Sequence, residues 1–202
     1  MDDGTRQVET WAGEFGRAYT DRNIGDPELR ADAFTELLGG LELGSILEVG
    51  CNRGQNLAAV GRGSTARLVG VDVNPYALDL ARREAPVAEY VEAQAAELPF
   101  PDASFDLVFT VGVLIHVSPE SLARVLAEIV RVSARFVLAA EYFAESEEVV
   151  HYRGRDDLLW RRDFHAAYLG VEPRLALVRS GYLGPERGFD RCHWWLLEKP
   201  GA

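Results

Sequence analysis

Short apolar runs alternate along most of this chain with segments whose apolar positions recur at helical spacing, and this alternation constrains the fold more than any other feature. The runs lie at 45–50, 66–74, 87–93, 105–112 and 135–142, and the helical patterns lie between them at 53–62, 74–85 and 118–133. Strands separated by helices of this length form parallel βαβ units with right-handed crossovers. The pattern predicts an α/β fold with a doubly wound, mostly parallel sheet.

The end of the chain departs from this alternation. Two further apolar runs, at 174–183 and 192–200, have no helical pattern between them. Such neighbours pair antiparallel, so they predict a C-terminal hairpin at one edge of the sheet. A length of 202 residues suits one well-cored domain, so we expect a single domain over 1–202.

Charge is spread unevenly along the chain. The net charge is 21 − 32 = −11, which argues against a nucleic-acid partner because neutralising phosphates requires a basic surface. Residues 1–150 carry 12 basic and 25 acidic side chains, whereas residues 151–202 carry 9 and 7. The last quarter is therefore where a contact with an anionic small molecule is expected, although a chance solvated face explains the same balance equally well.

Cys51 and Cys192 are the only cysteines, too few for a disulfide framework or a cysteine-based metal cluster, so no metal is expected. The first residues show no basic start followed by an apolar run, and no apolar run approaches the roughly 18 residues that a membrane span needs. We therefore expect a cytoplasmic protein with no membrane partner.

The stretch "ILEVGCNRGQNL", residues 46–57, has the form of a strand, a glycine loop and a helix start. Gly50 allows a sharp turn off the strand, and Gly54 allows close packing or the approach of a ligand. Asn52 stands where a positive φ is needed, and asparagine adopts such a φ most readily after glycine. The sequence predicts an intact nucleotide-binding loop at the carboxyl end of the first strand.

The spacing G-x-N-x-G does not fit the G-x-G-x-x-G fingerprint of dinucleotide sites. Asp72 ends the second apolar run, where an acid bonds ribose hydroxyls in more than one kind of cofactor site. Glu48, just before the loop, suits a cofactor with an ammonium group and no pyrophosphate, or else holds the loop by backbone bonds. A nicotinamide dehydrogenase is the poorer interpretation.

The motifs "ILEVGCNRG", "VGVDVNPYAL", "AELPFPDASFDLVFT" and "GVLIHVSPESL" together resemble class I S-adenosylmethionine-dependent methyltransferases, in order from residue 46 to about 141. The chain more narrowly resembles the family named "pseudaminic acid biosynthesis-associated methylase". That likeness includes "WAGEFGRAYTDRN" (11–23), the asparagine at 52 and "YRGRDDLLWRRDF" (152–164). The resemblance implies S-adenosyl-L-methionine as the cofactor.

By this resemblance, the loop at Gly50 lies along the methionine and ribose, and Asp72 binds the ribose hydroxyls. Gln94 stands where many relatives have an aspartate that meets the adenine amine. A glutamine carbonyl accepts that hydrogen bond without the charge. The backbone N–H of Ala95 is the stronger candidate for the adenine ring.

Four side chains at or beyond the ends of the fourth and fifth apolar runs are the candidate catalytic residues: His116, Glu141, Tyr142 and Arg153. His116 is either a base at the sulfonium or a packing residue of the loop. Glu141 either receives an ammonium or hydroxyl of the acceptor or pairs with an arginine. Arg153, beside Tyr152, is selected from four arginines because nearby aspartates can neutralise the others.

Trp11, Phe15, Tyr19 and Arg22 recur at spacings of about four, as on one face of a helix. The aromatic and arginine side chains favour a lid over the cofactor, with Trp11 against it and Tyr19 or Arg22 at the methionine carboxylate. The alternative is an amphipathic helix that only packs on the domain. We thus divide the domain into an N-terminal helical lid (1–40), a cofactor-binding core (45–142) and an acceptor-side segment with the hairpin (143–202).

The sequence therefore predicts a methyltransferase that uses S-adenosylmethionine and methylates an oxygen or nitrogen of a small, anionic or sugar-like metabolite. One alternative is a methyltransferase of a peptide or carrier-bound intermediate. Another is a protein that binds S-adenosylmethionine without catalysis. The acceptor and the oligomeric state do not follow from the sequence.

Overall fold

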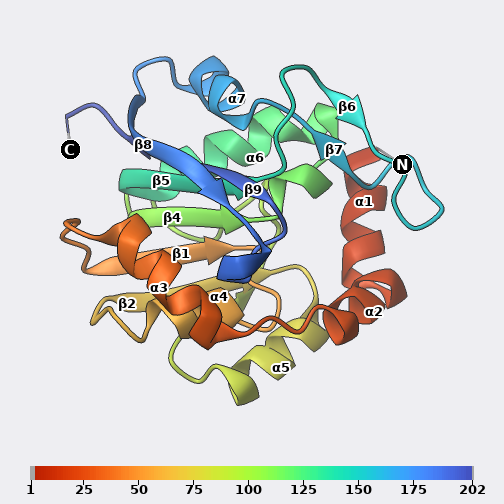
Figure 1. Cartoon of the computed structure of the whole chain (residues 1–202). Helices are drawn as coiled ribbons and strands as arrows, with labels where there is room; N and C mark the ends of the chain where they lie inside the picture. Colours follow the sequence, from red (N-terminus) through yellow and green to blue (C-terminus); the bar gives the residue numbers. More distant parts are fainter. Residues whose placement is uncertain (1–2, 202) are drawn as a thin grey trace.

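The computed structural model describes residues 3–201, which form a seven-stranded sheet with helices on both faces (Figure 1). Its strands are β1 (Ser45–Val49), β2 (Arg67–Asp72), β3 (Glu89–Glu92), β4 (Phe105–Val111), β5 (Ser133–Glu141), β8 (Ala176–Leu183) and β9 (Cys192–Glu198). They lie in the order β3-β2-β1-β4-β5-β9-β8. The first five pair in parallel, and β9 pairs antiparallel with both β5 and β8. The predicted doubly wound sheet and its terminal hairpin are confirmed.

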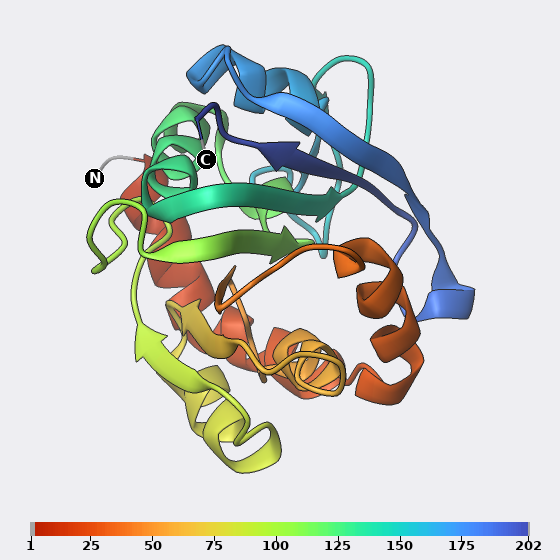
Figure 2. The ribbon, with the colours of Figure 1, turned by 90° about the vertical axis from the view of Figure 1, so that its left-hand side faces the viewer.

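The helices are α1 (Asp3–Ala12), α2 (Glu14–Arg22), α3 (Pro27–Leu38), α4 (Gln55–Val60), α5 (Pro75–Glu84), α6 (Pro119–Val132) and α7 (Phe164–Val171). Helices α6 and α7 share one apolar core, and α3 and α4 share the other. Side chains alternate between the two cores along each strand: on β5, Val137 and Ala139 face the first core, and Phe136 and Leu138 face the second. Figure 2 shows the sheet between these two helical layers.

Proline and capping residues explain where two of the crossover helices begin. Pro75 and Pro119 occupy the first helical position, where the missing N–H leaves no intrahelical bond unmade. Asn74 also caps α5 by accepting from the Tyr76 N–H at 3.1 Å. Because these signals are local, the sequence alone predicted where both helices begin.

The strand order reverses between β1 and β4, so the loops after these two strands flank a crevice at the carboxyl ends of the sheet. Figure 1 shows α1 and α2 at the same edge, toward which β1 and β4 run. The N-terminal segment therefore covers the place where an open α/β sheet binds its ligand.

The N-terminal segment differs from its prediction in two ways. The single helix expected through Trp11 and Arg22 is broken at Gly13, which has extended backbone (φ −91°, ψ −154°). Helix α3 buries Ala33 and Phe34 in the core of the sheet, so it belongs to a structural layer rather than to a lid. Only α1 and α2 remain as lid candidates.

The acceptor-side segment contains more structure than the sequence indicated. A two-stranded sheet of β6 (Glu148–Val149) and β7 (Trp160–Arg161) precedes α7. Strands of two residues have no readable alternation, and α7 is only eight residues long. Across residues 3–201, no helix combines the length and apolarity needed to cross a membrane.

Candidate active site

A cavity of about 1090 Å³ opens at the carboxyl ends of the parallel strands. Sites for a single drug-sized ligand span about 300–1,000 Å³, so this one has room for a cofactor together with a small acceptor. The predicted cofactor residues on its wall are Trp11, Tyr19, Arg22, Gly50, Asn52, Asp72, Gln94 and Ala95, and the predicted catalytic residues on it are His116, Tyr142 and Arg153. Glu48 and Glu141 do not line it.

The loop after β1 has the backbone that its sequence predicted. Asn52 adopts φ 47° and Gly50 φ 76°, so asparagine does take the left-handed conformation here. The N–H groups of Gly50 and Cys51 both donate to the carbonyl of Val71, at 2.8 and 2.9 Å. A Cβ at Gly50 would lie 2.5 Å from Val113, a contact that excludes any larger residue. The loop is bent toward the cavity and fixed to β2.

Asp72 fixes the same loop from the neighbouring strand. Its Oδ2 accepts from the Asn52 N–H at 2.8 Å, and its Oδ1 accepts from the Asn74 N–H at 2.9 Å. Burial raises the pKa of Asp72 despite these bonds. Each carboxylate oxygen retains a second lone pair, and the residue lies on the cavity wall. Asp72 can therefore shape the loop and accept hydrogen bonds from a ligand.

Three buried polar atoms on residues of the cavity wall have no hydrogen-bond partner among residues 3–201: Gln7 Nε2, Trp11 Nε1 and Asn52 Oδ1. Buried polar groups are nearly always paired, so these three atoms are available to a ligand in the cavity. An S-adenosylmethionine molecule offers matching groups, because its amine and ammonium donate while its carboxylate and ring nitrogens accept. The residues present fit this cofactor.

The segment after β3 supplies the opposite wall for an adenine. Gln94 and Ala95 both line the cavity. The backbone carbonyl of Gln94 accepts from the Glu97 N–H at 3.0 Å, a bond that does not involve the Gln94 side chain. The described part of the chain offers the Ala95 N–H no partner. The Ala95 N–H is thus free to donate to a ring nitrogen.

Glu48 is a correction to the sequence prediction. Its side chain is buried beneath α4, where Oε1 accepts from Asn56 Nδ2 at 2.7 Å. Burial raises the pKa of Glu48 to about 8, so the carboxyl is largely neutral at pH 7. It neither reaches the cavity wall nor presents a charge to an ammonium group. Glu48 instead helps to fix α4, and through Asn56 it connects to Arg30, whose Nη1 donates to Asn56 Oδ1 at 2.6 Å.

Glu141 is the second correction. It is fully buried, and its oxygens accept from the N–H groups of Val113 at 3.2 Å and Ile115 at 3.3 Å. Burial raises the pKa of Glu141 to about 7. These bonds hold the turn η1 (Leu114–His116), so Glu141 positions the loop that carries His116 and does not face an acceptor.

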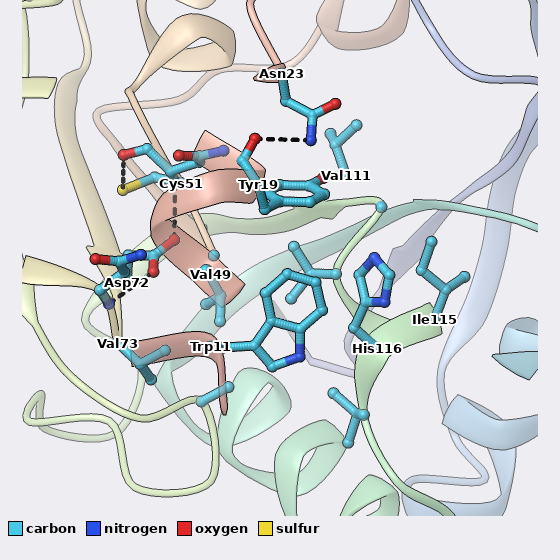
Figure 3. Close-up of a pocket in the computed structure, with 18 of the residues that line it drawn as sticks. Trp11, Tyr19, Asn23, Val49, Cys51, Asp72, Val73, Val111, Ile115 and His116 are labelled. Carbon is cyan, nitrogen blue, oxygen red and sulfur yellow. Dashed lines mark hydrogen bonds between the residues drawn. The ribbon is translucent and has the colours of Figure 1, made fainter. Parts of the chain in front are cut away.

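His116 lies within a group of aromatic rings at the cavity wall (Figure 3). Its ring centre is 4.5 Å from that of Trp11 and 5.6 Å from that of Tyr152. Nδ1 lies 2.6 Å from the carbonyl oxygen of Leu158, so in the neutral ring Nδ1 carries the proton and donates. Burial lowers the pKa of His116 to about 4, so the ring is neutral at pH 7 and Nε2 is an acceptor.

Figure 3 places Asp72 and His116 on opposite sides of the cavity, with Trp11 and Tyr19 between them. Trp11 and Tyr19 meet edge to face, their ring centres 5.2 Å apart, although they belong to different helices. The Arg22 guanidinium lies 5.3 Å from the centre of the Tyr19 ring. The aromatic stripe predicted for one helix is thus assembled from α1 and α2 across the break at Gly13.

Of the four arginines between residues 152 and 164, three are paired with acids, although only Arg155 pairs with one of the nearby aspartates. The pairs are Arg155–Asp157 (2.7 Å), Arg161–Glu148 (4.0 Å) and Arg162–Glu147 (2.6 Å). Arg153 is exposed on the cavity wall, and residues 3–201 provide it with no carboxylate partner. Its guanidinium lies 6.0 Å from the centre of the Tyr152 ring. The structure therefore leaves Arg153 available to an anionic ligand.

Sequence reasoning missed Gln7 and Asp190, which both line the cavity. Gln7 lies one helical turn before Trp11, and its Oε1 accepts from the Ser118 N–H at 2.8 Å. Its spacing from Trp11 was a usable signal. Asp190 lies between the turn η2 (Pro185–Arg187) and β9, and no motif marks it.

Comparison with known proteins agrees with this geometry. Residues 47–135 match the family described as "Methyltransferase domain". The match contains the loop after β1, Asp72, the 94–95 segment and His116. Residues 47–135 are thus similar to a methyltransferase domain, and the fold matches that of class I S-adenosylmethionine-dependent methyltransferases. These matches support S-adenosyl-L-methionine as the cofactor and methyl transfer as the activity.

Two relatives illustrate how far the likeness extends. An uncharacterized methyltransferase of Synechocystis is 36% identical over 87 residues, a match that covers 43% of this chain and 41% of that protein. The chain thus spans less than half the length of this first relative. The phosphatidylethanolamine N-methyltransferase of Cereibacter sphaeroides is 28% identical over 202 residues and is matched over 92% of this chain and 93% of its own.

Among solved structures, the magnesium protoporphyrin IX methyltransferase of Synechocystis with bound S-adenosylmethionine superposes with a TM-score of 0.73. The superposition covers 98% of both chains at 16% identity, so it shows a shared fold. Phosphatidylethanolamine and magnesium protoporphyrin IX, after which two of these proteins are named, are dissimilar molecules, so these likenesses do not specify an acceptor for this chain.

Proposed function

We propose that the protein transfers a methyl group from S-adenosylmethionine to an oxygen or nitrogen of a small, anionic or sugar-like metabolite. The observation that carries the proposal is Arg153, an unpaired guanidinium on the wall of the cavity that also contains the cofactor loop. Guanidinium groups bind carboxylates and phosphates through two parallel hydrogen bonds.

Bound S-adenosylmethionine supplies a methyl group already activated on a sulfonium. The protein has mainly to align the acceptor, and alignment alone can contribute several kcal/mol. The cofactor residues we propose are Asp72 for the ribose, Ala95 for the adenine, and Gly50, Asn52 and Arg22 for the methionine end. Trp11 and Gln7 would close the site from α1.

On the acceptor side, the neutral His116 can accept a hydrogen bond at Nε2 from the acceptor's O–H or N–H. Such a bond turns a lone pair of the acceptor toward the methyl group. A pKa of about 4 makes this ring a weak base, so we assign it a positioning role before a proton-accepting one. Tyr142, at the end of β5, lies on the same wall and is proposed to contact the acceptor.

Two other functions remain as competing proposals. A peptide or carrier-bound acceptor would need an open groove beside Tyr142 and Arg153, whereas both side chains line the cavity that also holds the cofactor loop. A nitrogen acceptor of the phosphoethanolamine type is favoured by the likeness to phosphatidylethanolamine N-methyltransferase over nearly the whole chain.

The test is methyl transfer from labelled S-adenosylmethionine into fractions of a bacterial extract, half of it treated with phosphatase. Label in a small molecule that is lost after phosphatase treatment supports an acceptor whose phosphate Arg153 binds. Label that survives the phosphatase treatment in an anionic small molecule means that Arg153 binds a carboxylate instead. Label found only in protein, or cofactor binding with no transfer into any fraction, contradicts the proposal.

A further inference from the structure

Two charged side chains of opposite sign lie on the acceptor side of the cavity, and residues 3–201 offer neither of them an ion-pair partner. Arg153 and Asp190 both line the cavity and are both exposed. Within residues 3–201 neither makes an ion pair or side-chain hydrogen bond, and they do not pair with each other. Acids elsewhere in the segment neutralise the neighbouring arginines, so these two charges stand apart from the local pattern.

Asp190 reaches the acceptor side because of the sheet register. Strand β9 runs antiparallel to β5 with His193 opposite Glu141, so the residues just before β9 lie beside the end of β5. That end carries Tyr142. Burial is the main cause of the raised pKa of Tyr142, and the charge of Asp190 is the next. The register therefore places Asp190 at the end of the sheet that carries the phenol we assign to the acceptor.

Arg153 reaches the cavity on a tight turn. Tyr152 and Arg155 exchange both backbone hydrogen bonds, at 2.8 and 3.1 Å, around Arg153 (φ 52°) and Gly154 (φ 81°). A turn with two positive φ values favours Asn-Gly, so an arginine in its first place carries backbone strain. Asp190 is likewise followed by a residue of positive φ, Arg191 at 56°. Each of the two charged side chains is therefore carried by a short loop.

We propose that Arg153 and Asp190 together select an acceptor that carries both an acidic group and an amine, such as an amino sugar phosphate. The inference rests on the proposed function, since it specifies the acceptor of the same site. Arg153 binds the acidic group, and Asp190 binds the ammonium, at opposite ends of one small molecule. The two charges are complementary to a zwitterion and leave a singly charged molecule with one unmatched group.

The experiment measures binding to the protein saturated with S-adenosylhomocysteine. The probes are glucosamine 6-phosphate, which carries both groups, and glucose 6-phosphate and glucosamine, which carry one each. O-Phosphoethanolamine and ethanolamine form a second set without a sugar, and vesicles with or without phosphatidylethanolamine test a lipid source of the same chemistry. The wild type should bind at least one doubly charged probe about tenfold more tightly than its singly charged relatives.

Two variants test which residue causes the preference for a doubly charged probe. Asp190→Asn should abolish the preference for glucosamine 6-phosphate over glucose 6-phosphate. Arg153→Gln should weaken the binding of both sugar phosphates about equally. Matched controls are Asp156→Asn and Arg155→Gln, whose side chains contact His151 and Asp157. No preference for any doubly charged probe, or a preference that survives Asp190→Asn, overturns the inference. Failure of the wild type to bind S-adenosylhomocysteine would instead refute the proposed function.

Discussion

At the cofactor end of the cavity, each carboxylate oxygen of Asp72 accepts a hydrogen bond from a backbone N–H. At the acceptor end, the side chains of Arg153 and Asp190 make no hydrogen bond or ion pair within residues 3–201. The cofactor end is therefore preorganised by the chain itself. The acceptor end presents charges that a ligand must satisfy. Preorganisation lowers the ordering cost of binding, so the cofactor end should bind its ligand without the acceptor present.

This difference indicates which residues determine cofactor affinity and which determine the choice of acceptor. The cofactor loop depends on backbone conformation, on the positive φ at Gly50 and Asn52 and the bonds to Val71. The acceptor end depends on side chains carried by short turns after β5 and before β9. Changes at the first end should alter cofactor affinity, and changes at the second should alter acceptor use.

Asp72→Ala should produce the largest effect. It removes the proposed ribose contacts and leaves the N–H groups of Asn52 and Asn74 without their acceptor, a loss of about 1–3 kcal/mol for each unpaired group. We expect affinity for S-adenosylhomocysteine to fall by more than about tenfold, measured by calorimetry. Asp79→Ala, which removes an exposed carboxylate of α5, is the control. Unchanged affinity would eliminate Asp72 as the ribose ligand.

Arg153→Gln should lower kcat/KM for the labelled acceptor about tenfold, as expected for loss of a charge-assisted hydrogen bond. Affinity for S-adenosylhomocysteine should not change, because Arg153 belongs to the acceptor end. Arg155→Gln removes a neighbouring charge that is already paired with Asp157 and should leave kcat/KM near that of the wild type. Equal losses in the two variants would mean that only the net charge of the segment matters.

His116→Gln should lower kcat about fivefold while sparing cofactor affinity, since one positioning hydrogen bond is worth about 1 kcal/mol. The pKa of His116 is lowered to about 4, so the neutral ring is present above that pH and is lost only as the pH falls through 4. Wild-type kcat should therefore show no His116 inflection between pH 5.5 and 8. An inflection near pH 6.5 that the substitution removes would contradict the buried, neutral ring.

Glu48→Gln should have the smallest effect on ligand binding and should change stability instead. The pKa of Glu48 is raised from 4.5 to about 8 in the folded chain, so the folded state retains a proton that the unfolded state has released. This contribution to stability is lost as the pH rises from 4.5 through 8. The melting temperature of the variant relative to the wild type should therefore rise with pH, by about 2–4 °C for each kcal/mol. A difference independent of pH would place a charged carboxylate under α4.

The sequence predicted most of the fold because its signals are local. Apolar runs predicted β1, β2, β4 and β5, and proline at the first helical position predicted the starts of α5 and α6. The positive φ of Asn52 followed from the chemistry of asparagine in a tight loop. The break at Gly13 was missed although glycine is a poor helix former, and the strands β6 and β7 were missed because two residues carry no readable alternation.

The two glutamates show where site prediction failed and what could have corrected it. Glu48 shares a strand face with Ile46, which packs with α4, and Glu141 shares a face with Val137 and Ala139, which pack with α6 and α7. The alternation along a strand therefore already directed both carboxyls into the cores. Asp190 could not be found in this way, because its position depends on the register between β9 and β5.

The most direct test of the divided cavity is a crystal structure of the protein with S-adenosylhomocysteine. We predict ribose hydroxyls within hydrogen-bond distance of the Asp72 carboxylate, the adenine beside the Ala95 N–H, and the sulfur directed toward His116 and Tyr142. Arg153 and Asp190 should then remain without a contact to the bound molecule. A homocysteine carboxylate bound to Arg153, or an adenine seated beside Tyr142, would contradict the division into a cofactor end and an acceptor end.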